Sequence, residues 1–394
     1  MKKIITLVLF ISFVAAAFAQ DEKKESGYTF TTVKELKVTP VKNQNRSGTC
    51  WSFSGLGFIE SELLRLGKGE YDLSEMFVVH HSYSDKAKRY VRLHGYNNFA
   101  AGGSFYDVLY VLKHYGIVPE TVMNGLQYGE ELHVHSELDA LTKAYIEAVV
   151  KNSNRKLTPV WLEGFNGILD AFLGKLPDTF SYNGKSYTPQ SFFHSLGVNA
   201  DDYVSLTSFT HHPFYTTFAL EIPDNWRWSE SYNLPLDEFM SIFDNSLNNG
   251  YTIAWGADVS EKGFSRDGVA IVPDVNLEEL SGSDRARWLG LSQKDKDAEL
   301  YKNTPGYEKT ITPELRQLAY DNYETTDDHG MLIYGIANDQ NGAKYYMVKN
   351  SWGETGNYKG FLYASEAFVK YKTINIVVHK NAIPAAIKQK LGIK

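Results

Sequence analysis

Hydrophobic residues recur at helical spacing directly after the single cysteine of the chain, Cys50. Apolar side chains follow it at intervals of three or four residues: Phe53, Leu56, Ile59, Leu63 and Leu66. This spacing places them on one face of a helix, and the pattern stops at Gly67. We therefore expect a helix that begins at or near Cys50, with the thiol in its first turn.

Further along the chain, the residue pattern changes from one typical of helices to one typical of strands. Residues 136–249 contain helical patterns broken by Asn, Gly and Pro. Later stretches are rich in β-branched and aromatic residues, which favour strands: 331–337, 345–349, 360–363 and 373–379. The pattern predicts an α+β fold with helices early and in the middle and a sheet late.

The N-terminus has the layout of a secretory signal. Lys2 and Lys3 precede an apolar run over residues 4–18, and Ala17-Phe18-Ala19 offers small residues for cleavage. The run is shorter than the roughly 20 apolar residues of a membrane span, and charged residues follow at once. We predict that residues 1–19 are a signal peptide and that the mature protein, of bacterial appearance, is secreted or periplasmic and not held in a membrane.

The net charge and the cysteine content exclude several classes of function. The chain of 394 residues has 40 Lys and Arg against 47 Asp and Glu, a net charge of −7, and no basic patch, which argues against a nucleic-acid partner. One cysteine excludes an internal disulfide and a Cys-based zinc cage. The thiol must therefore serve packing or chemistry.

Residues near Cys50 and late in the chain include the groups that nucleophilic catalysis requires: a nucleophile, a base, a residue that orients the base and a donor for an oxyanion. A thiol at a helix N-terminus is shifted towards thiolate, so we expect a low thiol pKa, and Gln44 can add an amide donor for an oxyanion. His329 can act as base, and Asn350 can orient it while Trp352 covers their hydrogen bond. An isolated buried cysteine is usually inert. The joint occurrence of these residues in this order favours catalysis.

This set resembles the papain-like cysteine peptidases and, more closely, the bleomycin hydrolase and aminopeptidase C branch. The family signature Cys-Gly-Ser/Ala-Cys-Trp/Tyr corresponds here to Ser47-Gly48-Thr49-Cys50-Trp51. The resemblance implies a papain-like fold and cleavage of peptide substrates through a thioester, with no cofactor. It assigns catalysis to four residues: Cys50 as nucleophile, His329 as base, Asn350 as orienting group and Gln44 as oxyanion donor.

The resemblance also implies a substrate site and an oligomer. Gly102 and Gly103 correspond to the glycine pair that binds the substrate backbone, and Trp352 completes the predicted substrate-binding residues. Members of this branch form hexameric barrels, so a homo-oligomer is implied. The alternative function is a catalytically inactive peptide-binding or scaffold protein on the same fold.

Spacing predicts the domain organisation. His329 follows Cys50 by 279 residues, whereas papain-type enzymes place the base about 130–150 residues downstream. We assign the surplus to a helical insertion at residues 136–249. The catalytic core is then formed by residues 27–135 and 250–380, and residues 381–394 form a C-terminal tail.

The C-terminal residues bear on the mode of cleavage. In the resembling branch, a C-terminal arm enters the cleft and its terminal carboxylate holds the free amino group of the substrate. Here the sequence fits a short packed helix with an apolar face instead: Ile383, Ala386, Ile387 and Leu391. We expect weak clamping of the amino group and a cleft more open to internal cleavage, with aminopeptidase and endopeptidase modes both open.

Histidine pairs and a pair of aspartates are the remaining candidates for chemistry. Three histidine pairs lack a carboxylate or cysteine at helix spacing, so we predict no metal centre: His80 and His81, His133 and His135, and His211 and His212. Asp327 and Asp328 precede His329 and could raise its pKa, although such loop carboxylates are usually solvated.

Overall fold

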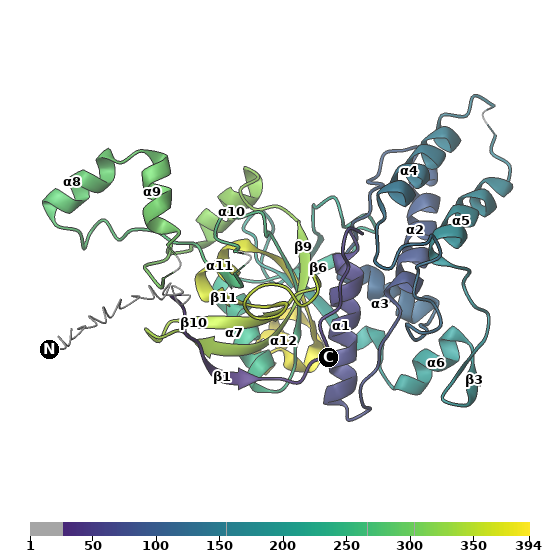
Figure 1. Cartoon of the computed structure of the whole chain (residues 1–394), viewed down its shortest axis with the longest axis horizontal. Helices are drawn as coiled ribbons and strands as arrows, with labels where there is room; N and C mark the ends of the chain where they lie inside the picture. Colours follow the sequence, from purple (N-terminus) through teal and green to yellow (C-terminus); the bar gives the residue numbers. More distant parts are fainter. Residues whose placement is uncertain (1–26, 155, 266, 303) are drawn as a thin grey trace, which may run out of the picture.

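Helix α1 (Cys50–Arg65) lies between a helical half and a β-sheet in the computed structural model, which describes residues 27–394 except 155, 266 and 303 (Figure 1). The helix begins at Cys50, as the hydrophobic spacing predicts. Its side chains from Trp51 to Leu63 are buried because both halves of the molecule contact it. The predicted signal peptide, residues 1–19, lies outside the described residues.

The helical half packs on one side of α1. Its elements are α2 (Glu75–Arg92), α3 (Phe105–His114), α4 (Ser136–Val150), α5 (Val160–Leu173), the hairpin of β2 (Phe180–Tyr182) and β3 (Lys185–Tyr187), and α6 (Pro189–Leu196). One hydrophobic core joins them to α1. Since α1 contributes side chains along its whole length to this core, the position of Cys50 is fixed by packing rather than by the loop before it.

The other side of α1 faces a ten-stranded sheet within the described part of the chain. Its strands are β1 (Thr31–Glu35), β4 (Tyr203–Thr207), β5 (Thr217–Ala219), β6 (Glu230–Asn233), β7 (Ile253–Ala257), β8 (Val269–Ala270), β9 (His329–Asn338), β10 (Lys344–Lys349), β11 (Phe361–Ser365) and β12 (Thr373–His379). The order is β5-β6-β4-β12-β7-β9-β10-β11-β8, and β1 pairs with β9. This arrangement confirms the predicted α+β class with a sheet late in the chain.

A second hydrophobic core fills the space between this sheet and the later helices. These are α7 (Leu236–Asn248), α10 (Pro313–Asp321), α11 (Glu366–Lys372) and α12 (Ala385–Leu391), with a short 3-10 turn at η2 (Lys380–Ala382), whereas the 3-10 turn η1 (Ala200–Asp202) packs in the first core. Two separate cores, one on each side of α1, leave the N-terminal end of that helix at the boundary between them.

The predicted helical insertion, residues 136–249, contains helices at both ends and three strands of the main sheet between them. Strand β4 belongs to the main sheet, where Leu206 pairs with Ile376 of β12, and β5 and β6 extend the sheet beyond it. Helix α7 packs against β7 and β9. Spacing along the chain does not reveal these strands, because β4 pairs with a partner more than 150 residues away.

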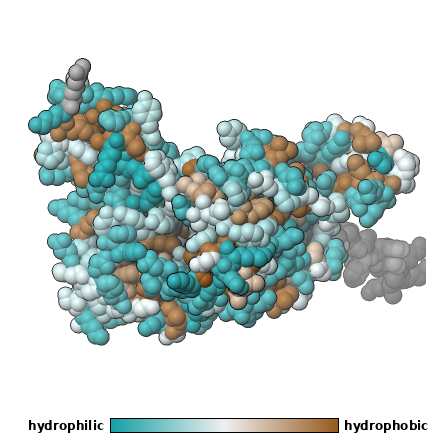
Figure 2. Space-filling model, turned by 180° about the vertical axis from the view of Figure 1, so that it is seen from behind, coloured by the Kyte–Doolittle hydropathy of each residue, from teal (hydrophilic) through white to brown (hydrophobic). Residues whose placement is uncertain are grey.

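Part of the surplus length lies elsewhere, in a segment that the sequence placed in the catalytic core. Helices α8 (Gly282–Gly290) and α9 (Gln293–Leu300) contain no buried residue, and they stand off the body of the molecule (Figure 1). Seen from behind, the same segment projects as a separate lobe with hydrophobic residues on its surface (Figure 2). One of these is Leu289, which is 58% exposed.

The C-terminal residues form the packed helix that their apolar pattern predicts. Ile387 and Leu391 of α12 are buried in the core beneath the sheet, and Lys390 forms an ion pair of 2.6 Å with Glu238 of α7. Within the described residues, every helix is too short or too polar to cross a membrane.

Candidate active site

Cys50 and His329 line one small cavity at the boundary between the two cores. Cys50 is the first residue of α1 and His329 the first residue of β9, and these two elements pack directly on each other. Gly330 permits the close approach, since a Cβ there would lie 2.6 Å from Oγ of Ser54. The remaining lining residues are Trp51, Gly103, Ser104, Phe105, Ile222, Asp224, Gly256, Asp327, Asp328, Gly330 and Asn375.

The His329 ring is held by Asn350 and Trp352, as the sequence predicts. Its Nε2 lies 2.7 Å from Oδ1 of Asn350. The same oxygen accepts the backbone N–H of Ser351 at 2.8 Å, so the Asn350 carbonyl oxygen is the atom that faces His329. Nε2–H is therefore the donor, and in the neutral ring Nδ1 has the free lone pair. The Trp352 ring covers the pair, with its centroid 4.8 Å from that of His329.

Gln44 is fixed by the same segment that contains Asn350. Its backbone N–H donates to the carbonyl of Ser351 at 2.8 Å, and its side-chain Oε1 accepts the Ser351 hydroxyl at 2.6 Å. Gln44 is buried. Because its carbonyl oxygen is occupied by Ser351, the side-chain NH2 is the group of Gln44 that is left to donate a hydrogen bond.

Burial acts in opposite directions on the two reacting groups. It raises the pKa of the Cys50 thiol to about 12, which the backbone N–H groups of Gly330 and Trp51 partly offset. It lowers the pKa of His329 to about 4, against the opposing effect of Asn350. Each charged form is unfavourable alone in the closed cavity, and proton transfer from thiol to imidazole would give two opposite charges that stabilise each other. The raised thiol pKa is opposite to the low value expected from the helix N-terminus, because burial outweighs the backbone N–H groups.

The predicted glycine pair lies next to the cavity on a braced loop. Trp51 Nε1 and the Tyr83 hydroxyl both donate to the Ala101 carbonyl at 3.2 Å. Lys86 donates to the carbonyls of Ala100 and Gly102. A Cβ on Gly103 would lie 2.8 Å from the Trp51 ring, so glycine is required for this packing. The loop is rigid on its buried side and presents its other side to the cavity.

Asp224 is a cavity residue that the sequence did not reveal. It comes from the loop between β5 and β6, and its Oδ2 lies 1.9 Å from where a Cβ on Gly102 would be. Burial raises the pKa of Asp224 to about 6, and Lys86 opposes this shift. Its Oδ1 accepts a hydrogen bond of 3.4 Å from the Asn98 side-chain amide. Pro223-Asp224-Asn225 reads as an ordinary turn, so no local signal could have found it.

The aspartates before His329 act on their neighbours and not on the base. Burial, followed by the charges of Asp224 and Asp328, raises the pKa of Asp327 well above its usual range. Asp328 accepts the backbone N–H of Ser260 at 3.0 Å. Burial and Asn350 are the causes that shift the pKa of His329, and the shift is downward, opposite to the increase considered from the sequence.

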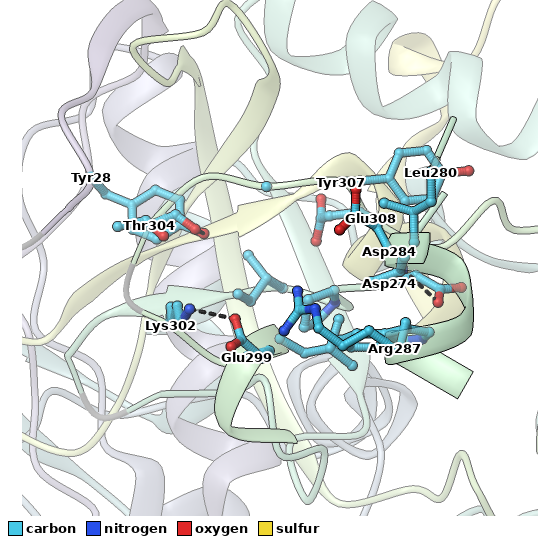
Figure 3. Close-up of a pocket in the computed structure, with 16 residues that line it drawn as sticks. Tyr28, Asp274, Leu280, Asp284, Arg287, Glu299, Lys302, Thr304, Tyr307 and Glu308 are labelled. Carbon is cyan, nitrogen blue, oxygen red and sulfur yellow. Dashed lines mark hydrogen bonds and ion pairs between the residues drawn. The ribbon is translucent and has the colours of Figure 1, made fainter. Parts of the chain in front are cut away.

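The structure has two further hollows, one that borders Asn350 and Trp352 and one at α8 and α9. A groove of about 860 Å³ is lined by Asn350 and Trp352 among other residues, but not by Cys50. A cavity of about 260 Å³ lies under α8 and α9, where Arg287 points from α8 towards Glu299 of α9 (Figure 3). The catalytic candidates do not line this second cavity.

The fold and site together define a papain-like cysteine peptidase, with helical and sheet halves on either side of a helix that starts at a cysteine. The sequence profile of the Peptidase C1-like family matches residues 3–285 and 281–393, so the chain belongs to this family. It is therefore an aminopeptidase C-type cysteine peptidase.

Individual relatives agree with this assignment. The chain is 26% identical to Aminopeptidase G of Lactobacillus delbrueckii subsp. lactis over 88% of this chain and 82% of that protein. It is 22% identical to Aminopeptidase C of Streptococcus thermophilus over 92% of this chain and 84% of that protein. The crystal structure of PepW from Lactobacillus rhamnosis superposes with a TM-score of 0.69 at 22% identity, covering 93% of this chain and 85% of PepW, which supports the fold.

Proposed function

We propose that this peptidase removes residues from free amino termini and that Asp224 holds the substrate's α-ammonium group. The observation that supports this mode is an ionisable carboxylate in the cavity that also contains Cys50; the nearby Lys86 ammonium lowers its pKa but donates its hydrogen bonds to the carbonyls of Ala100 and Gly102. A buried carboxylate favours a cationic ligand, because an unpaired charge in a closed site is costly. A free peptide amino terminus is such a ligand.

The proposed chemistry begins with proton transfer from the Cys50 thiol to Nδ1 of His329. The thiolate attacks the carbonyl carbon of the first peptide bond, and the oxyanion is held by the Gln44 side-chain amide and the Cys50 backbone N–H. The proton on His329 passes to the leaving amine as the C–N bond breaks, which leaves a thioester. Water then attacks the thioester, giving its proton to His329, and the free acid departs as the thiol is restored.

Asp224 serves this reaction in two ways. Its charge raises the thiol pKa of Cys50 in the empty site, so it disfavours the thiolate before substrate arrives. An ammonium group paired with Asp224 cancels that charge. A substrate with a free amino terminus is thereby anchored and also makes thiolate formation easier. An N-acylated substrate provides neither effect.

Two other modes remain as defined alternatives. A cleft open to internal cleavage would process peptides with blocked amino termini equally well. An inactive peptide-binding or scaffold protein would bind peptides without turnover. Cys50 and His329 line one cavity, and Asn350 and Trp352 hold the His329 ring, an arrangement that favours catalysis over the second alternative.

Steady-state kinetics with paired substrates tests the proposal. We expect kcat/KM for a free aminoacyl dipeptide amide to exceed that for its N-acetylated form by about 100-fold, and Asp224→Asn to reduce this ratio by about 10- to 100-fold, the effect of a charge-assisted hydrogen bond. Asp178→Asn changes an exposed aspartate outside the cavity and is the matched control. Equal rates for both substrates indicate the open cleft, and absence of turnover in the reduced protein indicates the scaffold.

We also propose that the protein is exported, on the basis of the charged, apolar and small-residue regions in residues 1–19. Expression of the full chain in a bacterium, fractionation, and N-terminal sequencing of the exported form test this. Cleavage after Ala19 supports export, whereas a cytoplasmic protein that retains residues 1–19 contradicts it.

The homo-oligomer implied by the family resemblance stays a prediction. Light scattering on the purified chain gives the molar mass directly. A mass of about six chains of 44.6 kDa supports the hexamer, and a mass of one chain excludes it under those conditions.

A further inference from the structure

Two histidines and a glutamate meet on the surface beside the strand pair β5 and β6. His211 and His212 lie in the turn after β4, and Glu221 follows β5. Nε2 of His211 is 2.8 Å from Glu221 Oε2, and Nε2 of His212 is 3.2 Å from Glu221 Oε1. One donor atom from each residue lies within 4.8 Å of the other two. The structure thus supplies the carboxylate that the sequence lacked at helix spacing.

The hydrogen bonds of His211 indicate which of its two ring nitrogens has the hydrogen atom. Nδ1 of His211 is 3.1 Å from Oε1 of Gln317, which also accepts the backbone N–H of Thr210 at 2.7 Å. The other end of this amide donates to Asp321 at 2.8 Å, so Oε1 is fixed as an acceptor. Nδ1 of His211 must then carry the hydrogen, and in the neutral ring Nε2 presents a lone pair to the Glu221 carboxylate. A cation between these two acceptors, either a proton on Nε2 or a metal ion, satisfies both.

Aromatic packing holds both imidazoles in place. The His212 ring stacks on Phe218 with centroids 4.1 Å apart, and the His211 ring stacks on Tyr320 at 5.7 Å. The rings therefore point their Nε2 atoms at one carboxylate without a ligand being present. Such orientation of a histidine through its second nitrogen is a feature of metal-binding histidines.

We propose that His211, His212 and Glu221 bind a divalent transition-metal ion, with Zn²⁺ as the reference ion. Two imidazoles and a carboxylate match the preference of Zn²⁺, whereas Ca²⁺ and Mg²⁺ prefer sets of oxygen ligands. Ligands about 2.0 to 2.1 Å from a tetrahedral ion are roughly 3.4 Å apart, so the His212 contact of 3.2 Å fits and the His211 contact of 2.8 Å must lengthen when the ion binds. The three residues are partly exposed, so water completes the coordination.

The site is placed to stabilise one wall of the catalytic cavity. Glu221 precedes Ile222 and Asp224, which line the cavity at Cys50. Its backbone carbonyl also accepts the Tyr320 hydroxyl at 2.7 Å. A bound ion would link the turn after β4 to the segment that carries these two lining residues. This inference does not depend on the proposed aminopeptidase mode.

Calorimetric titration of the full chain with ZnCl₂ tests the site. The protein carries Cys50→Ala, so that the catalytic thiol cannot bind the metal. We expect saturable binding of one ion per chain and a rise in the unfolding temperature. Glu221→Gln and His211→Ala should each weaken binding at least 10-fold, whereas His194→Ala, which changes an exposed histidine on α6, should leave it unchanged.

Co²⁺ provides a readout that does not rely on stability. Its visible absorption in the Cys50→Ala protein should appear on binding and disappear in the near-isosteric Glu221→Gln variant, whose folding is checked by circular dichroism. Absence of Zn²⁺ binding would show that the three residues form only protonated ion pairs. Binding that survives Glu221→Gln would place the ion elsewhere. Either result overturns the proposal.

Discussion

The Asp224 carboxylate occupies the space next to Gly102 where any other residue would place its side chain. A Cβ on Gly102 would lie 1.9 Å from Asp224 Oδ2, far inside van der Waals contact. This links the loop after β5 to the loop before α3 across the edge of the cavity. The absence of a side chain at Gly102 and the charge of Asp224 therefore define one surface for a substrate.

We expect Gly102→Ala to displace Asp224 and to lower kcat/KM for free amino-terminal substrates by about 10-fold or more, since substrate anchors tolerate little misplacement. Gly167→Ala is the control, because Gly167 lies in α5 with open space around it, and the change should stabilise the helix by up to about 1 kcal/mol. Kinetics and thermal unfolding of both variants measure this. Unchanged kinetics in Gly102→Ala would show that the contact has no role in substrate binding.

Substitutions of Cys50 and of Asn350 should reduce the rate of peptide hydrolysis to different extents. Cys50→Ala removes the nucleophile and should abolish peptide hydrolysis. Asn350→Ala removes only the group that orients Nε2 of His329, so it should lower kcat by roughly 10² to 10⁴-fold and leave measurable activity with little change in KM. Equal and complete loss in both variants, with folding intact, would contradict these roles.

The preference for a free amino terminus should depend on pH through Asp224. Its pKa is about 6, so the carboxylate is charged above that pH and neutral below it. The ratio of kcat/KM for the free substrate to that for the N-acetylated substrate should be at its maximum at pH 7 to 7.5, where the substrate ammonium is also charged. The ratio should decline as the pH falls below about 6. A ratio that stays constant from pH 5 to 7.5 would exclude Asp224 as the anchor.

Removal of the Asp224 charge should make the free thiol more reactive. The carboxylate raises the thiol pKa of Cys50, so Asp224→Asn should lower that pKa and increase the rate of alkylation by iodoacetamide at pH 7. The pH dependence of alkylation in the wild-type protein and in Asp178→Asn provides the comparison. A slower rate in Asp224→Asn would show that the carboxylate helps to form the thiolate, contrary to our account.

Local patterns and family motifs predicted much of this molecule. The apolar spacing after Cys50 specified where α1 begins, because that pattern lies within one helix. The motif around His329 and Asn350 predicted two residues that the structure joins by a hydrogen bond of 2.7 Å. In each case the signal is contained in a short segment whose residues act together.

Features that depend on distant pairing were not predictable in this way. Strand β4 is connected to β7 and β9 through β12, and Asp224 reaches the cavity because the loop after β5 lies against Gly102. The carboxylate that meets His211 and His212 likewise comes from beyond a strand rather than from a helical position. No residue near these positions indicates its partner, since the partner is set by tertiary packing.

Acid-quench mass spectrometry of the enzyme during turnover of a free hexapeptide tests the central claim most directly. Quenching preserves the thioester, and peptide mapping locates it. We predict an acyl group on Cys50 whose mass equals the first residue of the substrate alone. An acyl group of several residues would show internal cleavage, and the absence of any adduct on Cys50 during turnover would contradict the thioester mechanism.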